Sequence, residues 1–197
     1  MEPVEPIEDT WTSKKYAGCW SVKPAGFEAP SSEAANRWFA AQLRGSFDGL
    51  SHLARPWRVE LRTSSGADTT IERREGEASI LDRVEAEIAR LTEPLHSIDC
   101  ALDVSAYVRI APGAAPIRAW IRRASELTIW GGPNASASLT LDHTLFCPRS
   151  PDGDDNAEFY ALNAPILESA LRAWERRIGP IREVEGLEGI GRYGFSI

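Results

Sequence analysis

The stretch Asp99-Cys-Ala-Leu-Asp-Val-Ser-Ala-Tyr-Val-Arg-Ile110 decides the fold, because its side chains alternate between apolar and polar. One parity is apolar throughout: Cys100, Leu102, Val104, Ala106, Val108 and Ile110. The other parity is mostly polar and includes Asp103, Ser105, Tyr107 and Arg109. A period of two predicts a β-strand with one buried face and one face in water. Such alternation is typical of an antiparallel sheet that is covered on one side only.

Shorter segments with the same period lie on both sides of this strand. They are 16–22, 57–62, 69–73, 127–129 and 138–146, and the tail 181–197 is expected to add an edge strand. The run 64–68 is rich in Ser, Gly and Asp, which predicts a hairpin between the second and third of these segments. The segment 117–123 is ambiguous, because Ile117, Trp120 and Ile121 also fit a helical stripe, and we favour a strand.

Three further segments have the apolar spacing of amphipathic helices. Their expected ranges are 32–44, 77–93 and 164–178. The expected caps are Ser31 or Ser32 for the first and Asn163 for the last, and the expected stops are Gly45, Pro94 and Gly179. Together the segments predict an α+β fold, with a mainly antiparallel sheet and about three helices packed on one face.

Length and composition predict one domain over residues 1–197, because a chain of 197 residues supports one well-packed core better than two. Residues 1–12 are rich in proline and acidic side chains, and we expect this segment to be loosely held. The acidic start differs from a secretory signal, which predicts a cytosolic protein. The scarcity of lysine beside arginine indicates a bacterial genome of high GC content. Three cysteines without a C-x-x-C pair predict neither a disulfide framework nor a zinc knuckle, and Cys100 is expected in the core.

The formal net charge of -7 and the sequence pI near 5.1 bear on the partners. A net-negative protein is repelled by phosphate backbones and by anionic lipids, which argues against nucleic acid and membranes. A basic protein would be attracted instead. No apolar run approaches the roughly 20 residues that cross a bilayer.

Two motif-like stretches have simpler explanations than the chemistry they suggest. Gly189, Gly191 and Gly194 match G-x-G-x-x-G, but too few residues follow for a helix to receive a pyrophosphate, so a turn-rich tail is expected. The loop after Ser150 has the oxygen spacing of a calcium loop at Asp152, Asp154, Asn156 and Glu158. Ala157 stands where that loop needs glycine and Asn163 where it needs a bidentate Glu, which favours a solvated acidic loop.

Candidate catalytic groups are sparse. His52, His96 and His143 lack a second histidine at metal-binding spacing, so we predict no metal and no cofactor. A Cys147 nucleophile with His143 as its base lacks any supporting signature. Asp103, Glu126 and Asp142 would serve acid and base chemistry only if neighbouring strands brought them together. The sequence therefore predicts a protein that is not an enzyme.

The polar face of the predicted sheet carries the residue types that dominate binding energy in protein interfaces. The candidate partner-binding residues there are Tyr107, Arg109, Arg118, Trp120 and Arg122. A second candidate surface is acidic and consists of Asp152, Asp154 and Asp155, with Glu183, Glu185 and Glu188 nearby in the tail. The alternative for Trp120 is that the tail or a helix covers it.

Two short patterns lie near the ends of the chain: Tyr16-Ala-Gly-Cys-Trp20 ahead of the first helix, and Ile190-Gly-Arg-Tyr-Gly-Phe195 at the close. In these patterns and in its acidic α+β character the chain resembles the immunity proteins of bacterial polymorphic toxin systems. The resemblance implies a protein that binds a cognate toxin, such as a basic one, and blocks it without catalysing a reaction.

Two other functions stay open at this point. A small-molecule enzyme or ligand-binding domain would use a cleft lined by Asp103, Glu126, Asp142 and Arg109. A deep pocket joining these side chains would favour that alternative, whereas a flat, open sheet would favour the binding protein. A structural subunit of an assembly would show a large exposed apolar patch.

Overall fold

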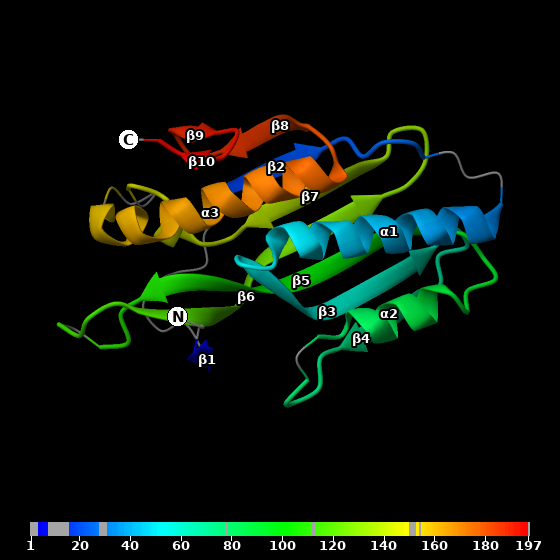
Figure 1. Ribbon diagram of the computed structural model, residues 1–197, viewed down its shortest axis with the longest axis horizontal. Coiled ribbons are helices and arrows are strands. Elements are labelled where there is room, and N and C mark those ends of the chain that lie inside the picture. Colours follow the sequence, from blue (N-terminus) through cyan, green and yellow to red (C-terminus); the bar gives the residue numbers. More distant parts are fainter. Residues whose placement is uncertain are drawn as a thin grey trace.

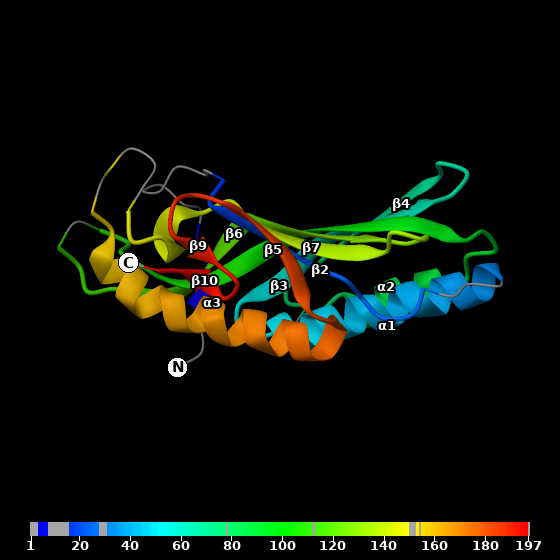
Figure 2. The same cartoon turned by 90° about the horizontal axis from the view of Figure 1, so that it is seen from above.

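The computed structural model describes residues 4–7, 16–27, 31–77, 79–111, 113–149, 153 and 155–196. These residues form an eight-stranded sheet with three α-helices on one of its faces (Figure 1, Figure 2). The strands of the sheet are β1 (Val4–Ile7), β2 (Gly18–Val22), β3 (Ala54–Thr63), β4 (Asp68–Glu72), β5 (Leu95–Val108), β6 (Ile117–Trp130), β7 (Ser136–Leu141) and β8 (Ile181–Gly186). Along the sheet they follow the order β4-β3-β5-β6-β7-β2-β8, and β1 pairs with β6 in parallel. The predicted α+β architecture is confirmed.

The two longest strands, β5 and β6, form the centre of the sheet. They pair antiparallel from Ser97 opposite Trp130 to Val108 opposite Ile117. The ambiguous segment 117–123 therefore lies in a strand, as predicted. The predicted apolar parity of β5 is buried from Cys100 to Val108, whereas Ile110 lies beyond the strand and is 53% exposed.

A bulge divides β6 into two halves. Leu102 pairs with Ser125 and Val104 with Ile121, so residues 122–124 stand opposite the single residue Asp103. Within the bulge Arg123 has a φ of 54°, which is uncommon for a residue other than glycine. The half after the bulge pairs with β7, and the half before it pairs with β1. The bulge thus allows β6 to pair with β1 along one half and with β7 along the other.

The helices are α1 (Ser32–Leu50), α2 (Leu81–Ile88) and α3 (Ala157–Ile178), and α1 runs antiparallel beside α3 (Figure 1). The predicted cap at Ser31 is confirmed, because its hydroxyl accepts from the Ala34 amide at 3.2 Å. The predicted stop at Gly45 is wrong. A Cβ on Gly45 would lie 2.8 Å from Ile178 Cδ1, and one on Gly49 would lie 2.7 Å from Trp174 Cα. These glycines let the two helices approach closely, so they serve packing rather than termination.

Three other predicted boundaries differ from the structure. The second helix is much shorter than 77–93. The third begins at Ala157, so Asn163 is a fully buried residue inside the helix and not its cap. The segment 138–146 leaves the sheet after Leu141 and forms the 3-10 turn η1 (Thr144–Phe146), which brings Phe146 into the core. The predicted stop at Gly179 is confirmed.

The core lies between the sheet and the helix layer. Its largest fully buried side chains include Trp20, Trp174, Phe39 and Phe146. Cys100 is buried there as predicted. In the part of the chain that is described, every helix is too short or too polar to cross a membrane.

The two terminal patterns pack against each other although they are far apart in sequence. The Trp20 indole donates to the Gly191 carbonyl at 2.8 Å, and its ring meets Phe195 edge-on at 5.9 Å. Ile190 lies so close to Gly18 that a Cβ there would be 2.3 Å from Ile190 Cδ1. The glycine-rich tail is a small hairpin of β9 (Ile190–Gly191) and β10 (Gly194–Phe195), with no helix after it in the described residues.

Glu175 of α3 holds this hairpin in place. Its carboxylate accepts from the Tyr193 hydroxyl at 2.5 Å and from the Ile181 amide at 2.9 Å, and it pairs with Arg192. Partial burial by itself raises the pKa of Glu175, but hydrogen bonds from Arg192, Tyr193 and Ile181 outweigh it and lower the pKa from 4.5 to about 2. The charged form therefore stabilises the fold.

We expect Glu175→Gln to destabilise the protein by about 2 kcal/mol at neutral pH, after allowance for solvent screening of the partly exposed pair. Because the folded-state pKa is lowered, this contribution is complete above pH 4.5 and is lost as the pH falls toward about 2. Urea unfolding of both proteins from pH 7 to pH 2.5 measures it. The difference in free energy of unfolding between the two proteins should shrink as the pH falls below 4.5. A difference that does not change with pH would show that the charge of Glu175 does not stabilise the fold.

Candidate functional site

The face of the sheet turned away from the helices, which we call the outer face, is left uncovered by every helix of the described residues (Figure 2). Paired strands place alternate residues on it side by side, as in the row Arg62, Ser97 and Trp130. A second row, formed by Asp99, Thr128, Ser138 and Ser21, reaches toward the opposite edge. The outer face is therefore broad and mostly polar.

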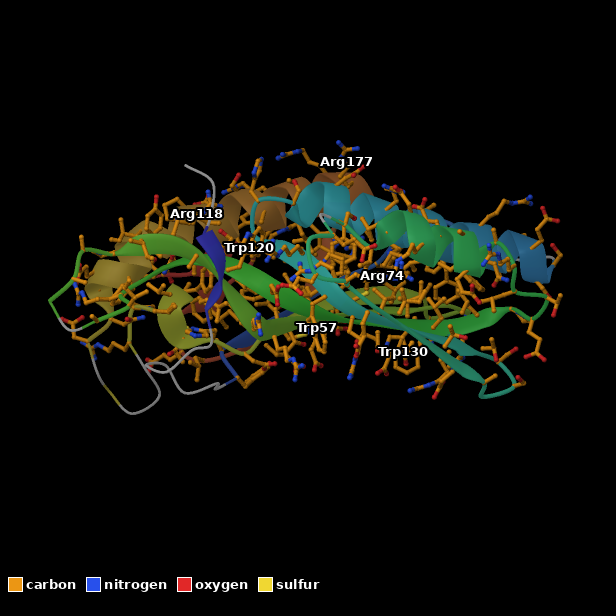
Figure 3. All side chains as sticks on the ribbon, turned by 90° about the horizontal axis from the view of Figure 1, so that it is seen from below. Trp57, Arg74, Arg118, Trp120, Trp130 and Arg177 are labelled. Carbon is orange, nitrogen blue, oxygen red and sulfur yellow. The ribbon has the colours of Figure 1, made fainter. Side chains whose placement is uncertain are left out.

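Four of the predicted binding residues, Tyr107, Arg118, Trp120 and Arg122, lie on β5 and β6 at one end of the outer face, and Figure 3 labels Arg118 and Trp120. Tyr107 and Trp120 are half-buried, and Arg122 is exposed within the bulge. The Trp120 ring lies 4.4 Å from the guanidinium carbon of Arg55. Arg118 donates from Nε to Ser105 Oγ at 2.8 Å and from Nη2 to the His52 carbonyl at 2.7 Å. Its guanidinium is therefore held in a fixed position.

Arg109 lies apart from these residues, beyond the end of β5. It makes two hydrogen bonds of 2.8 Å to the Glu158 carboxylate and donates to the Ala114 carbonyl at 2.8 Å. Its guanidinium carbon lies 5.3 Å from the centre of the Phe159 ring. The structure therefore joins Arg109 to the start of α3 rather than to Trp120.

Asp103 and Ser105 were expected in water, and this expectation is wrong. Asp103 is 1% exposed and Ser105 is fully buried. Arg73 donates to Asp103 Oδ2 at 2.6 Å, and Arg55 Nε lies 3.5 Å from the same oxygen. The Arg123 amide donates to Asp103 Oδ1 at 3.4 Å. The carboxylate is therefore a buried anchor for two arginines and for the bulge.

Around Asp103 the outer face carries a group of guanidinium and indole side chains, which we call the arginine–tryptophan patch. It consists of Arg55, Trp57, Arg73, Trp120 and Arg123. The Arg123 guanidinium lies 4.1 Å from the centre of the Trp57 ring. Stacking of this kind contributes about 0.5–2 kcal/mol per pair and orders both side chains. Only Trp120 of this patch was predicted from the sequence.

Of the carboxylates proposed for catalysis, one lines the hollow that the described residues form on the outer face. The outer face has a shallow hollow of about 220 Å³, lined by Arg58, Glu60, Arg62, Asp99, Cys100, Ala101, Glu126 and Thr128. The small-molecule alternative predicted a cleft lined by four residues, and Glu126 is the one of them that lines this hollow. The other three, Asp103, Asp142 and Arg109, are not among its lining residues.

The Cys147 and His143 pair shows no sign of an activated nucleophile. Both side chains are buried, and burial raises the pKa of the Cys147 thiol to about 12. His143 Nδ1 accepts from the Leu145 amide at 3.3 Å. A thiol with so high a pKa is protonated at neutral pH and is a poor nucleophile. Among the described residues, no three His, Cys, Asp or Glu side chains are arranged to hold a metal ion.

Of the predicted acidic surface, Asp152 and Asp154 lie outside the described residues. Asp155 is exposed, and its carboxylate accepts from the Ala157 amide at 2.9 Å at the start of α3. Asn156 donates to the Thr144 and Cys147 carbonyls, and Glu158 pairs with Arg109. Glu183 and Glu185 are exposed on β8, opposite Ser21 and Cys19 of β2.

Comparisons of the chain with protein-family models, with curated proteins and with solved structures gave no match. The class of protein must therefore be argued from the outer face itself.

Proposed function

We propose that this protein is a non-catalytic binding protein that recognises another protein through the outer face of its sheet. The observation that carries the proposal is the arginine–tryptophan patch, together with Tyr107, Arg118 and Arg122, on a face without a covering helix in the described residues. Tryptophan, tyrosine and arginine are the side chains that most often dominate binding energy at protein interfaces.

The side chains of this surface are already ordered, which favours binding. Arg118 is fixed by Ser105 and His52, and Arg55 is fixed by Asp103 and the Trp120 ring. Fixing a flexible side chain at an interface costs about 0.5–1.5 kcal/mol, and a side chain that is already held avoids most of this cost. The half-buried indole rings also expose apolar area that a partner would cover.

The more specific proposal is a cytosolic immunity protein that binds a toxin and blocks it. Its support is the resemblance of the two terminal patterns and the net charge of -7, which steers a basic partner toward the protein. The alternative, a small-molecule enzyme, has weaker support, because the hollow on the outer face is shallow and contains one of its four proposed residues.

Co-expression with the product of the neighbouring gene tests the proposal. We expect the two proteins to purify together in a fixed ratio, and we expect this chain to restore growth of cells that the other product inhibits. If the two proteins form no complex and growth is not restored, the proposal that this protein is an immunity protein is refuted.

Trp120→Ala should weaken the complex by about 2 kcal/mol or more, roughly thirtyfold in Kd. The matched control is Trp130→Ala, because Trp130 lies on the same strand and the same face but at the far end, where it is 38% exposed (Figure 3). Titration calorimetry with the purified partner measures both. Equal losses of affinity for the two variants, or no loss for Trp120→Ala, would show that the interface lies outside the patch.

A further inference from the structure

We infer that the outer edge of β4 is where the protein partner adds an extended basic segment to the sheet as a further strand. The inference rests on the proposed function and adds the form in which the partner binds. It concerns the edge of the sheet that borders the arginine–tryptophan patch, and its chemistry is that of backbone hydrogen bonds and of flanking charges.

The edge strand β4 has backbone groups that point away from the sheet. Among the described residues β4 pairs with β3 on one side and with no strand on the other. Just after β4, the Arg73 amide donates to the Trp57 carbonyl of β3 at 2.7 Å. Residues that bond to the neighbouring strand alternate with residues that do not in an antiparallel ladder, so the amides and carbonyls of Asp68, Thr70 and Glu72 face outward.

The outward groups are open in the middle of this edge. The Arg83 guanidinium donates to the Glu72 carbonyl at 2.5 Å, but no described residue bonds to the outward amide and carbonyl of Thr70. Figure 2 shows the hairpin of β3 and β4 projecting away from the helix layer. A strand added there would pair with Thr70 through two backbone hydrogen bonds.

The two edges of the sheet differ in their protection. Natural sheets protect exposed edges with charged side chains and with coverings. The other edge strand, β8, carries Arg182 and Glu183, and the Glu175 carboxylate accepts from its first amide at 2.9 Å. The middle of β4 is Thr69-Thr70-Ile71, which carries no charge and consists of β-branched side chains that favour strands. The edge of β4 is therefore the one suited to pairing with another chain.

The charges at the two ends of β4 select the occupant. Asp68 and Glu72 stand opposite Arg62 and Arg58, which line the outer face. Asp68 pairs with Arg62, but both side chains are exposed and such a pair is weak, and Glu72 has no ion pair in the described part of the chain.

These charges disfavour a second copy of the chain as the occupant. A second β4 laid antiparallel against the first would set Asp68 of one copy opposite Glu72 of the other, and like charges directly opposite each other are destabilising. Basic side chains at the same two positions of a partner would be attracted instead. The net charge of -7 steers a basic partner toward the protein in the first place.

The positions between the two charges face the helix layer. Ile71 and Thr69 stand opposite Val59 and Leu61, which are buried in the core. Ile71 itself is only partly buried. Apolar side chains of an added strand would cover its exposed part. The expected partner segment therefore alternates basic and apolar residues, with two basic residues four positions apart.

The edge of β4 is continuous with the proposed binding surface. Arg73 of the arginine–tryptophan patch directly follows β4, and its amide bonds to Trp57 of the same patch. One partner can therefore pair with β4 and contact the patch at the same time.

Nuclear magnetic resonance on the ¹⁵N-labelled full chain tests the inference through the outward amides of Asp68 and Thr70. The probe is the acetylated and amidated peptide Lys-Val-Thr-Val-Lys. One control peptide has glutamate in place of both lysines, and the other has an N-methylated central threonine, which cannot donate to the Thr70 carbonyl. We expect the lysine peptide to move both amide resonances in a saturable way, and each control peptide to bind about fivefold more weakly or worse.

Thr70→Pro is the test variant, because it removes an outward amide and no hydrogen bond to β3. Proline is tolerated on an edge strand at such a position. Thr70→Val is the matched control, since it keeps the amide and the β-branched shape. We expect Thr70→Pro to weaken binding of the lysine peptide by about tenfold, measured at the Asp68 amide, and Thr70→Val to leave it unchanged. Coincident resonances along β5 show that both variants are folded.

Glu72→Lys provides a second test that keeps every backbone group of the edge. We expect it to reverse the preference between the peptides, so that the glutamate peptide binds more tightly than the lysine peptide. An unchanged preference would show that the charge at the end of β4 does not select the occupant.

Three further results would overturn the inference: equal binding of the lysine and glutamate peptides to the wild type, full binding of the N-methylated peptide, or equal affinity of Thr70→Pro and Thr70→Val. A free chain that is dimeric and that Thr70→Pro makes monomeric would also overturn it, because the edge would then belong to a second copy. These results are separable from the fate of the proposed function. A stable complex whose affinity is the same with Thr70→Pro refutes only the inference, whereas the lack of any complex refutes the proposed function.

Discussion

Replacing Asp103 with alanine is expected to destabilise the fold by about 4 kcal/mol. Asp103 is 1% exposed and is the carboxylate that Arg73 and Arg55 both approach. Its removal leaves the poorly solvated guanidinium of Arg73 without its carboxylate and takes a carboxylate away from beside Arg55. It also removes the acceptor of the Arg123 amide in the β6 bulge. Breaking a buried pair by removal of one partner is among the costliest single substitutions.

Two control variants separate charge from packing. Asp103→Asn keeps the size and one acceptor oxygen, so its loss in stability measures the charge. Asp99→Ala removes another aspartate from the same strand and face, where its carboxylate accepts from Thr128 at 2.9 Å but is only half-buried. Urea unfolding should give a loss of about 1 kcal/mol there. A loss for Asp103→Ala no larger than this would show that solvent or another group satisfies the two arginines.

The alternation around Asp103 predicted the central strand correctly and the surroundings of its polar face incorrectly. Periodicity distinguishes the two faces of a strand, but it says nothing about which long side chains from neighbouring strands lie across a face. Here Arg55 stands opposite Asp103 on β3, and Arg73 follows β4. Their side chains cover a carboxylate that the local pattern places in water.

The predicted helix boundaries at Gly45 and Asn163 are wrong for a related reason. Gly45 and Asn163 are common stop and cap residues, and local chemistry alone assigns them those roles. In the structure, Gly45 packs against Ile178 of the antiparallel helix, and Asn163 reaches a strand more than fifty residues earlier. Contacts at such separations override local preference, and a single sequence does not reveal them.

The candidate site was predicted in part. Trp120, Tyr107 and Arg118 lie together on the outer face because they belong to two strands whose pairing follows from their alternation. Trp57 and Arg123 were missed. Arg123 lies in the β6 bulge, and Trp57 lies at a break in the register between β3 and β5. Residues inside a bulge fall outside the alternation of their strand, so an alternation analysis assigns them to the wrong face or to none.

Asn163→Leu is expected to destabilise the fold by about 3 kcal/mol, because Asn163 completes the edge of β5 where β3 no longer reaches it. Its Oδ1 accepts from the Tyr107 amide at 2.6 Å, and its Nδ2 donates to the Tyr107 carbonyl at 3.1 Å and to the Leu145 carbonyl at 3.3 Å. Leucine has a similar volume but leaves these three backbone groups without that partner. The loss is therefore one of hydrogen bonding rather than of packing.

Amide hydrogen exchange locates the effect, and Asn163→Asp serves as the control. At neutral pH aspartate keeps the acceptor for the Tyr107 amide but sets a buried carboxylate against the Tyr107 and Leu145 carbonyls, so its cost should be no smaller than that of leucine. In Asn163→Leu the Tyr107 amide should exchange faster than global unfolding requires, while Cys100 and Leu102 at the centre of β5 should follow global stability. Because Tyr107 pairs with Arg118, this loosening would also reach the proposed binding surface. Unchanged protection of Tyr107 would mean that water replaces the asparagine at this edge, and that α3 does not set the position of the surface.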